Sequence, residues 1–289
     1  MAHFTPLKFT SSSGSFFLSQ RKVVGHQSMA GDHFHSNYEI FYLLAGERVY
    51  FIKDRSYHVR KGNIIFIKPF DLHTTQDTGT PNHERFLIKF NPEFLVDSAG
   101  VAPQSLELLF SRYNFVSFDP LYQNAVDRLF ETMRQEIQNR SFDYENCLRS
   151  LLLQLLIFAA RNTNRNEEVP HLNPTHGRIS EIVKYINQNY QEKLTLSMVA
   201  GLFHVSPYYL SRSFKEVTGL TFTDYFNNLR VSIAQKMLQD SDHSVLFVAN
   251  EVGFENQSYF GKLFKNITGI SPLQYRKRLE TGAKDSFQE

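Results

Sequence analysis

The stretch Val205-Ser-Pro-Tyr-Tyr-Leu-Ser-Arg-Ser-Phe-Lys-Glu-Val-Thr-Gly219 decides the fold of the last third of this chain, because it occurs twice. Fifty positions later the sequence reads Glu255-Asn-Gln-Ser-Tyr-Phe-Gly-Lys-Leu-Phe-Lys-Asn-Ile-Thr-Gly269. Both copies keep an apolar residue, a Phe-Lys pair, a β-branched residue and a final Thr-Gly at equivalent places. A duplication of this size indicates two copies of one supersecondary motif.

The first copy carries the signals of a short helix with defined ends. Leu210, Phe214 and Val217 are spaced four and three apart, so they form one apolar stripe on a helix. Ser206, which is followed by a proline, is the expected N-cap. Gly219 can take the left-handed conformation that ends a helix.

The second copy repeats these signals, with Asn256 as the expected cap and Gly269 as the stop. Another short helical pattern precedes each copy, and its expected caps are Thr195 and Ser244. Gly253 falls in the second turn, where helix-turn-helix units often carry glycine. The sequence therefore predicts two helix-turn-helix units.

Polar side chains lie opposite both apolar stripes, as a DNA-recognition helix requires. Arginine can bind guanine through two hydrogen bonds, and hydroxyl or amide groups can bind other base edges. For a single helix, ordinary solvated charges would be the better explanation. The repeat and the caps favour DNA recognition instead. The residues on these faces are Tyr208, Ser211, Arg212 and Lys215 in the first copy and Ser258, Gly261, Lys262 and Lys265 in the second.

The region from about Ile179 to Arg278 resembles the DNA-binding domain of the AraC-type bacterial transcription regulators. The most specific part of the resemblance is the run Val248-Ala249, Gly253-Phe254, Gln257-Ser258-Tyr259-Phe260, Phe264-Lys265, Gly269-Ile270-Ser271-Pro272 and Tyr275-Arg276. The resemblance implies that one long helix, at 221–239, joins the two units. It also implies that two recognition helices enter successive major-groove faces of one DNA site.

Carried over by position, the resemblance also implies which residues contact bases. We expect the first helix to discriminate more between sequences, because Gly261 has no side chain and Lys262 lacks the fork of arginine. The implied base contacts are Tyr208, Ser211 and Arg212 in the first unit and Asn256, Gln257, Ser258 and Lys262 in the second, and Lys215 and Lys265 complete the expected DNA contacts.

Charge and composition fit this prediction. The 289 residues carry a net charge of +2, but residues 177–279 hold 12 Lys/Arg and 8 Asp/Glu, a net charge of +4. Residues 1–176 are neutral overall, with 18 of each sign. Positive charge therefore gathers where phosphate attraction needs it. Cys147 is the only cysteine, and the apolar stretch 151–160 is too short to span a bilayer, so we expect a cytoplasmic protein without membrane contact.

In the N-terminal half the apolar residues follow a different pattern. Short aromatic and β-branched runs begin at Glu39, Arg48, Tyr57, Asn63 and Phe86, with glycine or proline between them. Short strands at close spacing predict a sandwich or a barrel.

Within this region, His33-Phe-His35 is followed by Glu39 and Gly46, and then by Gly62, Pro69 and His73. This order resembles the two motifs of cupin barrels, which also form the sensor half of many AraC-type regulators. The closing asparagine of the cupin pattern is absent. The expected fold is an α+β multidomain protein: a cupin-like sensor and dimerisation domain with two accessory helices at 1–163, a linker at 164–177, and an all-α domain with two helix-turn-helix units at 178–280.

His33, His35, Glu39 and His73 are the candidate ligand-binding residues, and three interpretations of them stay open. They could bind a divalent metal, which suits an oxygenase-like enzyme or a metal-assisted sensor. They could hydrogen-bond a small effector without metal, which suits a regulator best. Some of them could also merely satisfy local backbone groups or face water. Two histidines at alternate positions would point to one face of a strand. Nearby aromatic residues could line a sugar pocket, although they are also ordinary core residues: Phe34, Tyr38, Phe41 and Tyr42.

Two amphipathic helices are predicted at 121–139 and 142–160. The broad leucine face of the second must be buried within the subunit or against a twin. We therefore expect a non-enzymatic transcription regulator without cofactor or bound metal. Its expected partners are promoter DNA, a small effector such as a carbohydrate, a second copy of the chain and RNA polymerase. The alternatives are a metal-dependent cupin enzyme fused to a DNA anchor and a constitutive regulator with a purely dimerising barrel.

Overall fold

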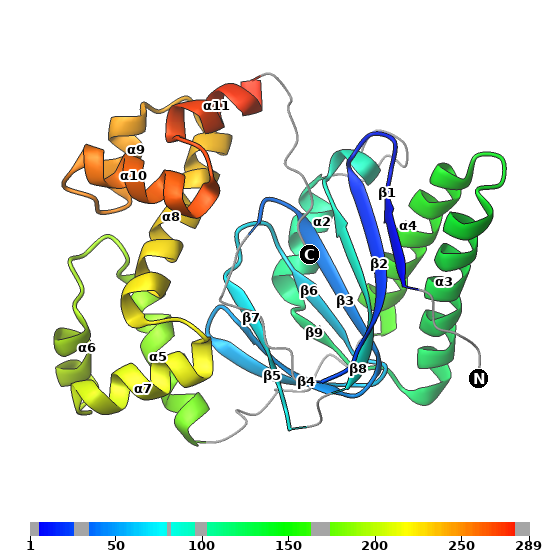
Figure 1. Ribbon diagram of the computed structural model, residues 1–289, viewed down its shortest axis with the longest axis horizontal. Coiled ribbons are helices and arrows are strands. Elements are labelled where there is room, and N and C mark those ends of the chain that lie inside the picture. Colours follow the sequence, from blue (N-terminus) through cyan, green and yellow to red (C-terminus); the bar gives the residue numbers. More distant parts are fainter. Residues whose placement is uncertain (1–5, 26–34, 80–81, 96–102, 163–173, 281–289) are drawn as a thin grey trace.

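The computed structural model describes residues 6–25, 35–79, 82–95, 103–162 and 174–280. It consists of an N-terminal domain of β-sheets flanked by helices and a C-terminal domain made of helices (Figure 1). The predicted α+β multidomain architecture is confirmed. In this part of the chain, no helix has the length and apolarity that crossing a membrane would require.

The N-terminal strands form two antiparallel sheets. The larger has the order β1-β2-β8-β3-β6-β9 and the smaller the order β5-β4-β7. Their bounds are β1 Leu7–Thr10, β2 Phe16–Val23, β3 Tyr38–Ala45, β4 Glu47–Ile52, β5 Arg55–Arg60, β6 Ile64–Ile67, β7 His73–Asp77, β8 His83–Phe90 and β9 Phe115–Val116. The sequence predicted the strands near β3, β4, β5, β6 and β8, but not β1, β2, β7 or β9.

The two sheets share one core between their inner faces. Phe41 and Leu87 of the large sheet pack there with Tyr50 and Val59 of the small one. Because successive side chains of a strand point to opposite faces, the even-numbered residues of β3, such as Tyr42, turn outward. They pack against helices on the other side of the large sheet.

That outer face packs against the helices α2 Pro103–Arg112, α3 Pro120–Asn139 and α4 Tyr144–Asn162. The sequence predicted α3 and α4 but not α2. The prediction that the second helix begins at 142 was wrong by two residues, because Arg140 and Asp143 have positive φ and break the helical path. Leu152 and Leu155 are fully buried against the sheet, so the leucine face is covered within the subunit.

The C-terminal helices are α5 Pro174–Gln188, α6 Leu196–Leu202, α7 Pro207–Thr218, α8 Phe222–Asp240, α9 Val245–Glu251, α10 Gln257–Thr268 and α11 Pro272–Glu280. Helix α8 matches the long connecting helix expected at 221–239, and Figure 1 shows it running between the two units. Helix α5 begins at Pro174, so the last four residues of the expected linker 164–177 are helical. A proline is favourable at the first position of a helix, since its missing N–H would have no helical partner.

Candidate functional sites

The two helix-turn-helix units have the predicted end signals. The Oγ of Ser206 accepts a hydrogen bond from the N–H of Tyr209 at 3.1 Å, and the Oδ1 of Asn256 accepts one from Tyr259 at 2.9 Å. Thr195 and Ser244 cap the preceding helices α6 and α9 in the same way. Such caps satisfy N–H groups that the first turn leaves without a partner.

The opposite ends are also as predicted. Gly219 and Gly269 have φ values of 83° and 81°, and each donates its N–H to the carbonyl four residues earlier. Phe214 and Phe264, which occupy equivalent places in the repeat, are fully buried. Caps at both ends and a buried stripe fix which face of α7 and of α10 remains outside.

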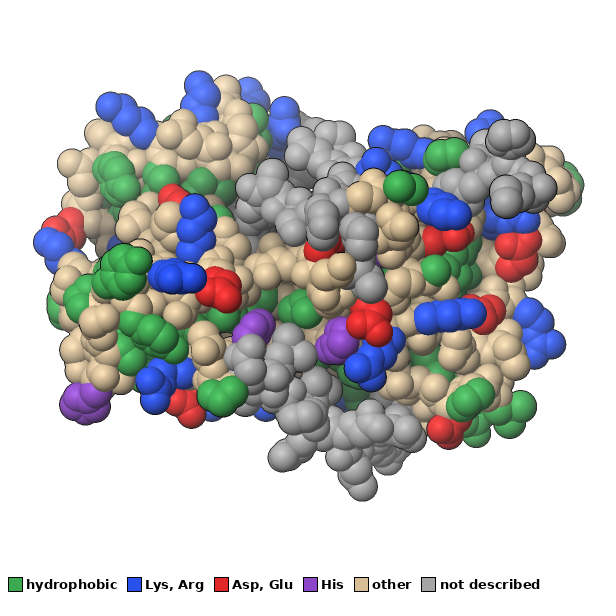
Figure 2. Space-filling model, turned by 60° about the horizontal axis from the view of Figure 1, so that its bottom comes forward, with side chains coloured by type: hydrophobic (Ala, Val, Ile, Leu, Met, Phe, Trp, Pro, Cys, Tyr) green, Lys and Arg blue, Asp and Glu red, His purple; other side chains and the backbone are tan. Residues whose placement is uncertain are grey.

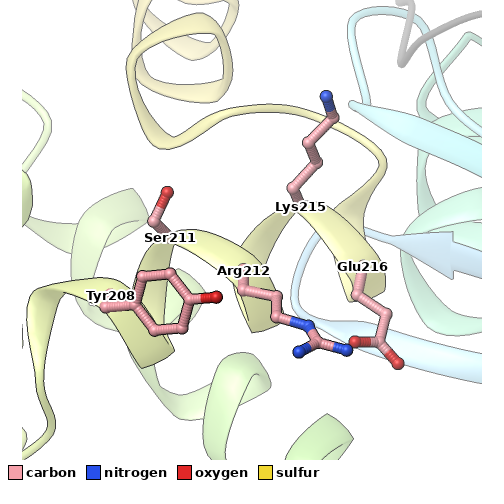
Figure 3. A pocket seen from close by; sticks show the side chains of 5 residues that line it. All are labelled: Tyr208, Ser211, Arg212, Lys215 and Glu216. Atoms are coloured by element: carbon pink, nitrogen blue, oxygen red, sulfur yellow. The ribbon is translucent and has the colours of Figure 1, made fainter.

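The outer face of α7 carries every candidate residue predicted for it. Tyr208, Ser211, Arg212 and Lys215 are exposed and line a shallow hollow together with Glu216. Figure 3 shows Ser211 and Lys215 along one side of this face and Tyr208, Arg212 and Glu216 along the other. Sequence reasoning missed Glu216, although its spacing of four from Arg212 could have placed it there. A carboxylate in this position can accept from cytosine in the major groove.

The outer face of α10 carries the second set: Asn256, Gln257, Ser258, Lys262 and Lys265 are all exposed. The carbonyl oxygen of the Asn256 side chain is engaged in the cap, so this residue has only its NH₂ group to offer DNA. In Figure 2, basic and hydrophobic side chains are exposed together over the helical domain, in the left half of the view.

Arg230 of α8 holds the two units together. Its guanidinium donates to the carbonyls of Tyr190, Gln191 and Glu192, which follow α5, at 2.7, 3.4 and 2.8 Å. It also lies 5.3 Å from the ring of Phe254, after the turn of the second unit. A single buried side chain therefore contacts segments of both units.

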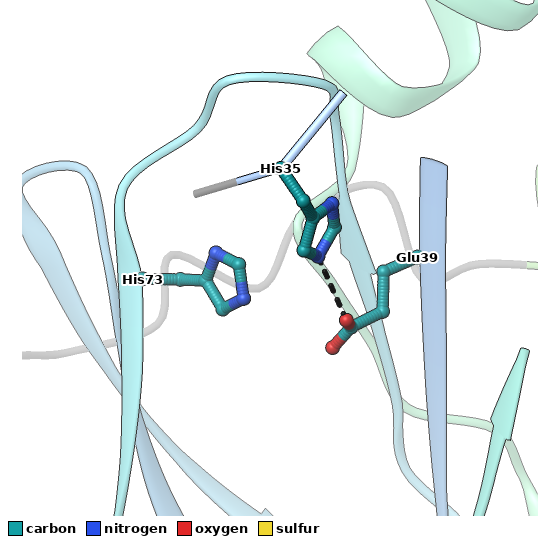
Figure 4. Close-up of side chains that lie close together, drawn as sticks. All are labelled: His35, Glu39 and His73. Carbon is teal, nitrogen blue, oxygen red and sulfur yellow. Dashed lines mark hydrogen bonds and ion pairs between the residues drawn. The ribbon is translucent and has the colours of Figure 1, made fainter. Parts of the chain in front are cut away.

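The N-terminal candidate residues also gather, with one exception. His35, Glu39 and His73 each offer a ligand atom, and these atoms lie within 4.8 Å of one another. The Nε2 of His35 lies 2.9 Å from a carboxylate oxygen of Glu39 (Figure 4). His33 lies outside the described residues. The prediction that His35 belongs to a strand was wrong, because it precedes β3 and reaches Glu39 from the adjoining loop.

Lys89 is a fourth member of this cluster, and sequence reasoning missed it. Its Nζ lies 3.4 Å from Glu39, and both side chains are buried. Burial raises the pKa of Glu39, but Lys89, His35 and His73 outweigh it and hold that pKa well below its ordinary value. Strand alternation alone could place Lys89 on the inner face, but only the β3–β8 register puts it opposite Glu39.

The hydrogen bonds decide how this cluster can act. His35 faces acceptors on both ring nitrogens, the carbonyl of Asn37 at 2.9 Å and Glu39. His73 uses Nδ1 toward the carbonyl of Asp71 at 2.8 Å, so its Nε2 is the nitrogen that can serve a ligand. The set has the donor types for a divalent metal, but Lys89 already neutralises the one carboxylate. A polar organic ligand could use the same groups without displacing that ion pair.

The small sheet of the N-terminal domain docks directly onto the first helix-turn-helix unit, which the sequence did not predict. Phe51 and Leu72 are buried in the same core as Ile182 and Phe214 of that unit. The cluster around Phe264 of the second unit contains residues of the C-terminal domain alone.

Three hydrogen bonds surround this apolar contact. The hydroxyl of Tyr225 donates to the carbonyl of Lys53 at 3.3 Å. Ser56 lies 2.7 Å from His176, and Gln76 donates to the carbonyl of Glu216, near the end of α7, at 3.1 Å. The contact thus reaches the helix that carries the first set of DNA candidates.

Comparison with known protein families agrees with both halves of this description. Residues 199–278 match the family of a helix-turn-helix domain, and residues 25–156 match that of an AraC-like ligand binding domain.

Several curated proteins are similar to the chain. The uncharacterized HTH-type transcriptional regulator YfiF of Bacillus subtilis is 26% identical over 89% of this chain and 82% of its own length. The HTH-type transcriptional activator RhaS of Escherichia fergusonii is 25% identical over 85% of this chain and 87% of its own length. The bifunctional transcriptional activator/DNA repair enzyme AdaA of Bacillus subtilis is 40% identical, over 33% of this chain and 46% of its own length.

The fold has the two expected halves, the family matches cover both, and the long matches are to transcription regulators. The chain belongs to the AraC-type transcription regulators, as a DNA-binding protein with a ligand-binding N-terminal domain.

Proposed function

We propose that α7 and α10 read the promoter together and that α7 supplies most of the sequence discrimination. The observation that carries this proposal is the pair of exposed polar faces on two equally capped helices joined by α8. Arg212 on α7 can form two hydrogen bonds with a guanine, whereas Lys262 on α10 acts as a point charge. Lys215 and Lys265 occupy equivalent positions at the ends of these helices and suit phosphate contacts.

Selection of binding sites from a random duplex library with the full-length protein tests this proposal. We expect enriched sites with two conserved blocks, about one helical turn or 10 bp apart. We expect the block bound by α7 to be the more strongly conserved. Enrichment of a single block, or of none, would contradict the two-helix mode.

The cluster of His35, Glu39, His73 and Lys89 is the proposed effector site. It combines a buried carboxylate, an ammonium and two imidazoles on the inner side of the β-domain, which suits a small polar molecule such as a carbohydrate. Of the aromatic residues considered for a sugar pocket, Phe41 faces the inner core, whereas Tyr38 and Tyr42 face the helices, and Phe34 lies outside the described residues.

The docked interface provides a route from this site to DNA. His73 hydrogen-bonds the carbonyl of Asp71, and the carboxylate of Asp71 lies 3.0 Å from Lys53. The carbonyl of Lys53 accepts from Tyr225 in the first helix-turn-helix unit. Leu72, between Asp71 and His73, packs in the core of that unit. A ligand that moves His73 would therefore also move Leu72, which lies in the same core as Phe214 of α7.

Screening small metabolites for thermal stabilisation of the full-length protein tests the effector role. A ligand at one hundred times its Kd stabilises the native state by about 2.7 kcal/mol. We expect a stabilising compound to change the affinity for a selected DNA site, and His73→Gln to weaken both effects. A compound that stabilises the protein equally in this variant would not use the proposed site.

We also propose that the protein acts as a cytoplasmic homodimer that works with RNA polymerase and catalyses no reaction. Leu121 and Tyr122 on α3 and Ile157 on α4 are partly or largely exposed. Sedimentation of the full-length protein checks this, since Ile157→Glu should yield a folded monomer. A folded wild-type monomer at high concentration would remove the dimer from the proposal.

A further inference from the structure

The buried carboxylate of Glu39 receives both of its partners on one oxygen. Nε2 of His35 lies 2.9 Å from Oε2, and Nζ of Lys89 lies 3.4 Å from the same atom. The other oxygen, Oε1, has no hydrogen-bond partner among the residues that the structure describes. Figure 4 shows it turned away from the bond to His35. Glu39 is only 4% exposed, so little of this carboxylate is open to bulk water.

The carboxylate of Glu39 is charged, which makes the missing donor costly. Burial raises the pKa of Glu39, but Lys89 and His35 outweigh burial and hold that pKa well below its ordinary value. A buried charged oxygen without a donor costs more free energy than a neutral acceptor in the same place. Within the described part of the chain, the site is therefore short of one hydrogen-bond donor.

His73 places a second acceptor beside this oxygen. Its Nδ1 lies 2.8 Å from the carbonyl of Asp71, and because a carbonyl only accepts, Nδ1 carries the proton. The lone pair of the neutral ring is then on Nε2, on the side of the ring that Figure 4 shows turned toward Glu39. The positive charge of Lys89 beside Glu39 opposes a second proton on this ring. Ligand atoms of His73 and Glu39 lie within 4.8 Å of each other, so one small molecule can reach both.

We propose that the effector donates one hydroxyl group to Oε1 of Glu39 and an adjacent hydroxyl group to Nε2 of His73. This inference rests on the proposed effector role of the cluster and adds the chemical class of the ligand, a neutral compound with neighbouring hydroxyl groups. A hydroxyl that donates to a carboxylate forms a charge-assisted hydrogen bond, which is one of the strong kinds.

The same geometry disfavours the charged alternatives. An ionised carboxylate has no proton to donate and would meet two acceptors. An ammonium group could donate, but Lys89 lies 3.4 Å from the carboxylate of Glu39 and would repel a second cation there. The hydroxyl group is the donor that brings no charge of its own.

Nitrogen-15 NMR of the histidine rings in the full-length protein tests the premise without any ligand. The signals of His73 are assigned with His73→Gln. We expect His73 at neutral pH to be protonated at Nδ1 and unprotonated at Nε2. A proton on Nε2 would overturn the inference, because the ring could then donate to Glu39 and supply the missing partner.

Ligand selectivity is tested by titrating the same protein with aldopentoses and aldohexoses, each beside its deoxy, amino and uronic acid forms. We expect a neutral sugar to give a saturable shift at Nε2 of His73. A deoxy form that lacks one of two adjacent hydroxyl groups should bind about tenfold to a hundredfold more weakly, which corresponds to the loss of one hydrogen bond to a charged group. The amino and uronic acid forms should also bind more weakly than the parent sugar.

Glu39→Gln tests the carboxylate itself, and Glu47→Gln is the matched control. Each of these carboxylates lies 2.9 Å from a histidine, but Glu47 is 41% exposed on β4. In Glu39→Gln the amide oxygen can still accept from His35 and Lys89, so the NH₂ group takes the place of Oε1 and donates where the carboxylate accepted. We expect the sugar affinity to fall at least about tenfold in Glu39→Gln and to stay unchanged in Glu47→Gln. If Glu39→Gln does not fold, the tautomer of His73 and the deoxy sugars decide the question in the wild-type protein.

Two binding results would overturn the hydroxyl assignment and leave the effector role intact. One is a saturable shift of His73 with an acid or an amine and with no neutral sugar. The other is equal affinity for a sugar and for all its deoxy forms, or an equal loss in Glu39→Gln and Glu47→Gln. If no compound of the sugar panel or of the metabolite screen shifts His73 or stabilises the protein, the proposed effector role fails as well.

Discussion

The two helix-turn-helix units can be compared at a pair of equivalent tyrosines. Tyr225 and Tyr275 follow the two copies of the repeat at the same offset of fifty positions. The ring of Tyr225 meets Phe214 edge-on with a centroid distance of 5.4 Å, and the ring of Tyr275 meets Phe264 in the same way at 5.7 Å. The hydroxyl of Tyr225, however, also reaches Lys53 of the β-domain and lies 2.9 Å from Asn187. Tyr275 belongs to a core built from the C-terminal domain.

From the repeat alone, the two units would have the same role. The contact of Tyr225 with the β-domain indicates that their roles differ. The first unit shares its core with Phe51 and Leu72, so its position depends on the sensor. The second unit depends on the first through α8 and Arg230. We infer that control by the effector enters through α7, while α10 acts as an anchor.

The largest effect is expected when the link between the units is removed. Arg230→Met keeps much of the side-chain volume but leaves three carbonyls without their charged donor, which should cost about 3 kcal/mol of unfolding free energy. Urea unfolding of the full-length protein measures it. Lys236→Met, at an exposed position on the same helix, is the control and should be near neutral. If Arg230→Met weakened DNA contacts of the first unit alone, Arg230 would not couple the two.

The second prediction compares base recognition by the two helices. Arg212→Ala should cost about 1–3 kcal/mol on a selected site and little on random DNA, because it removes a contact to bases. Lys262→Ala should cost less binding free energy. Lys215→Ala should weaken binding to both the selected and the random DNA, and should flatten the salt dependence of that binding. Fluorescence anisotropy at several salt concentrations separates these cases. Equal losses for Arg212→Ala on selected and random DNA would contradict its role in base recognition.

The third prediction uses the paired tyrosines as matched variants. Tyr225→Phe removes a hydroxyl that contacts the β-domain, so it should cost about 1 kcal/mol and loosen the docked segment. Hydrogen exchange should then increase around Lys53 and Leu72. Tyr275→Phe changes the equivalent place in the second unit and should leave exchange in that segment as it is. Equal exchange in the two variants would mean that the tyrosine hydroxyl does not hold the domains together.

The contrast between the units also explains what the sequence could predict. The caps at Ser206 and Asn256 and the stops at Gly219 and Gly269 are local signals, which a repeat makes easy to recognise. The docking of Phe51 and Leu72 joins segments more than one hundred residues apart, and no periodicity encodes it.

The candidate effector site shows the same limit. Sequence reasoning selected His35, Glu39 and His73, which the fold brings together. It missed Lys89, whose place opposite Glu39 depends on the pairing of β3 with β8. Residue types could be selected from the sequence, but their partners depend on strand register.

The smallest effect is expected from metal removal, which tests whether the N-terminal domain needs a metal ion. Since Lys89 neutralises Glu39 and His35 faces acceptors on both ring nitrogens, we expect purified protein to contain substoichiometric metal. Elemental analysis of the purified protein measures the content, and chelation should leave both DNA affinity and effector-dependent binding unchanged. Full occupancy by iron, manganese or zinc, lost in His73→Ala, would instead identify a metal centre. That result would move control of the first unit from an organic ligand to a metal, and would revive the metal-dependent cupin as the alternative function.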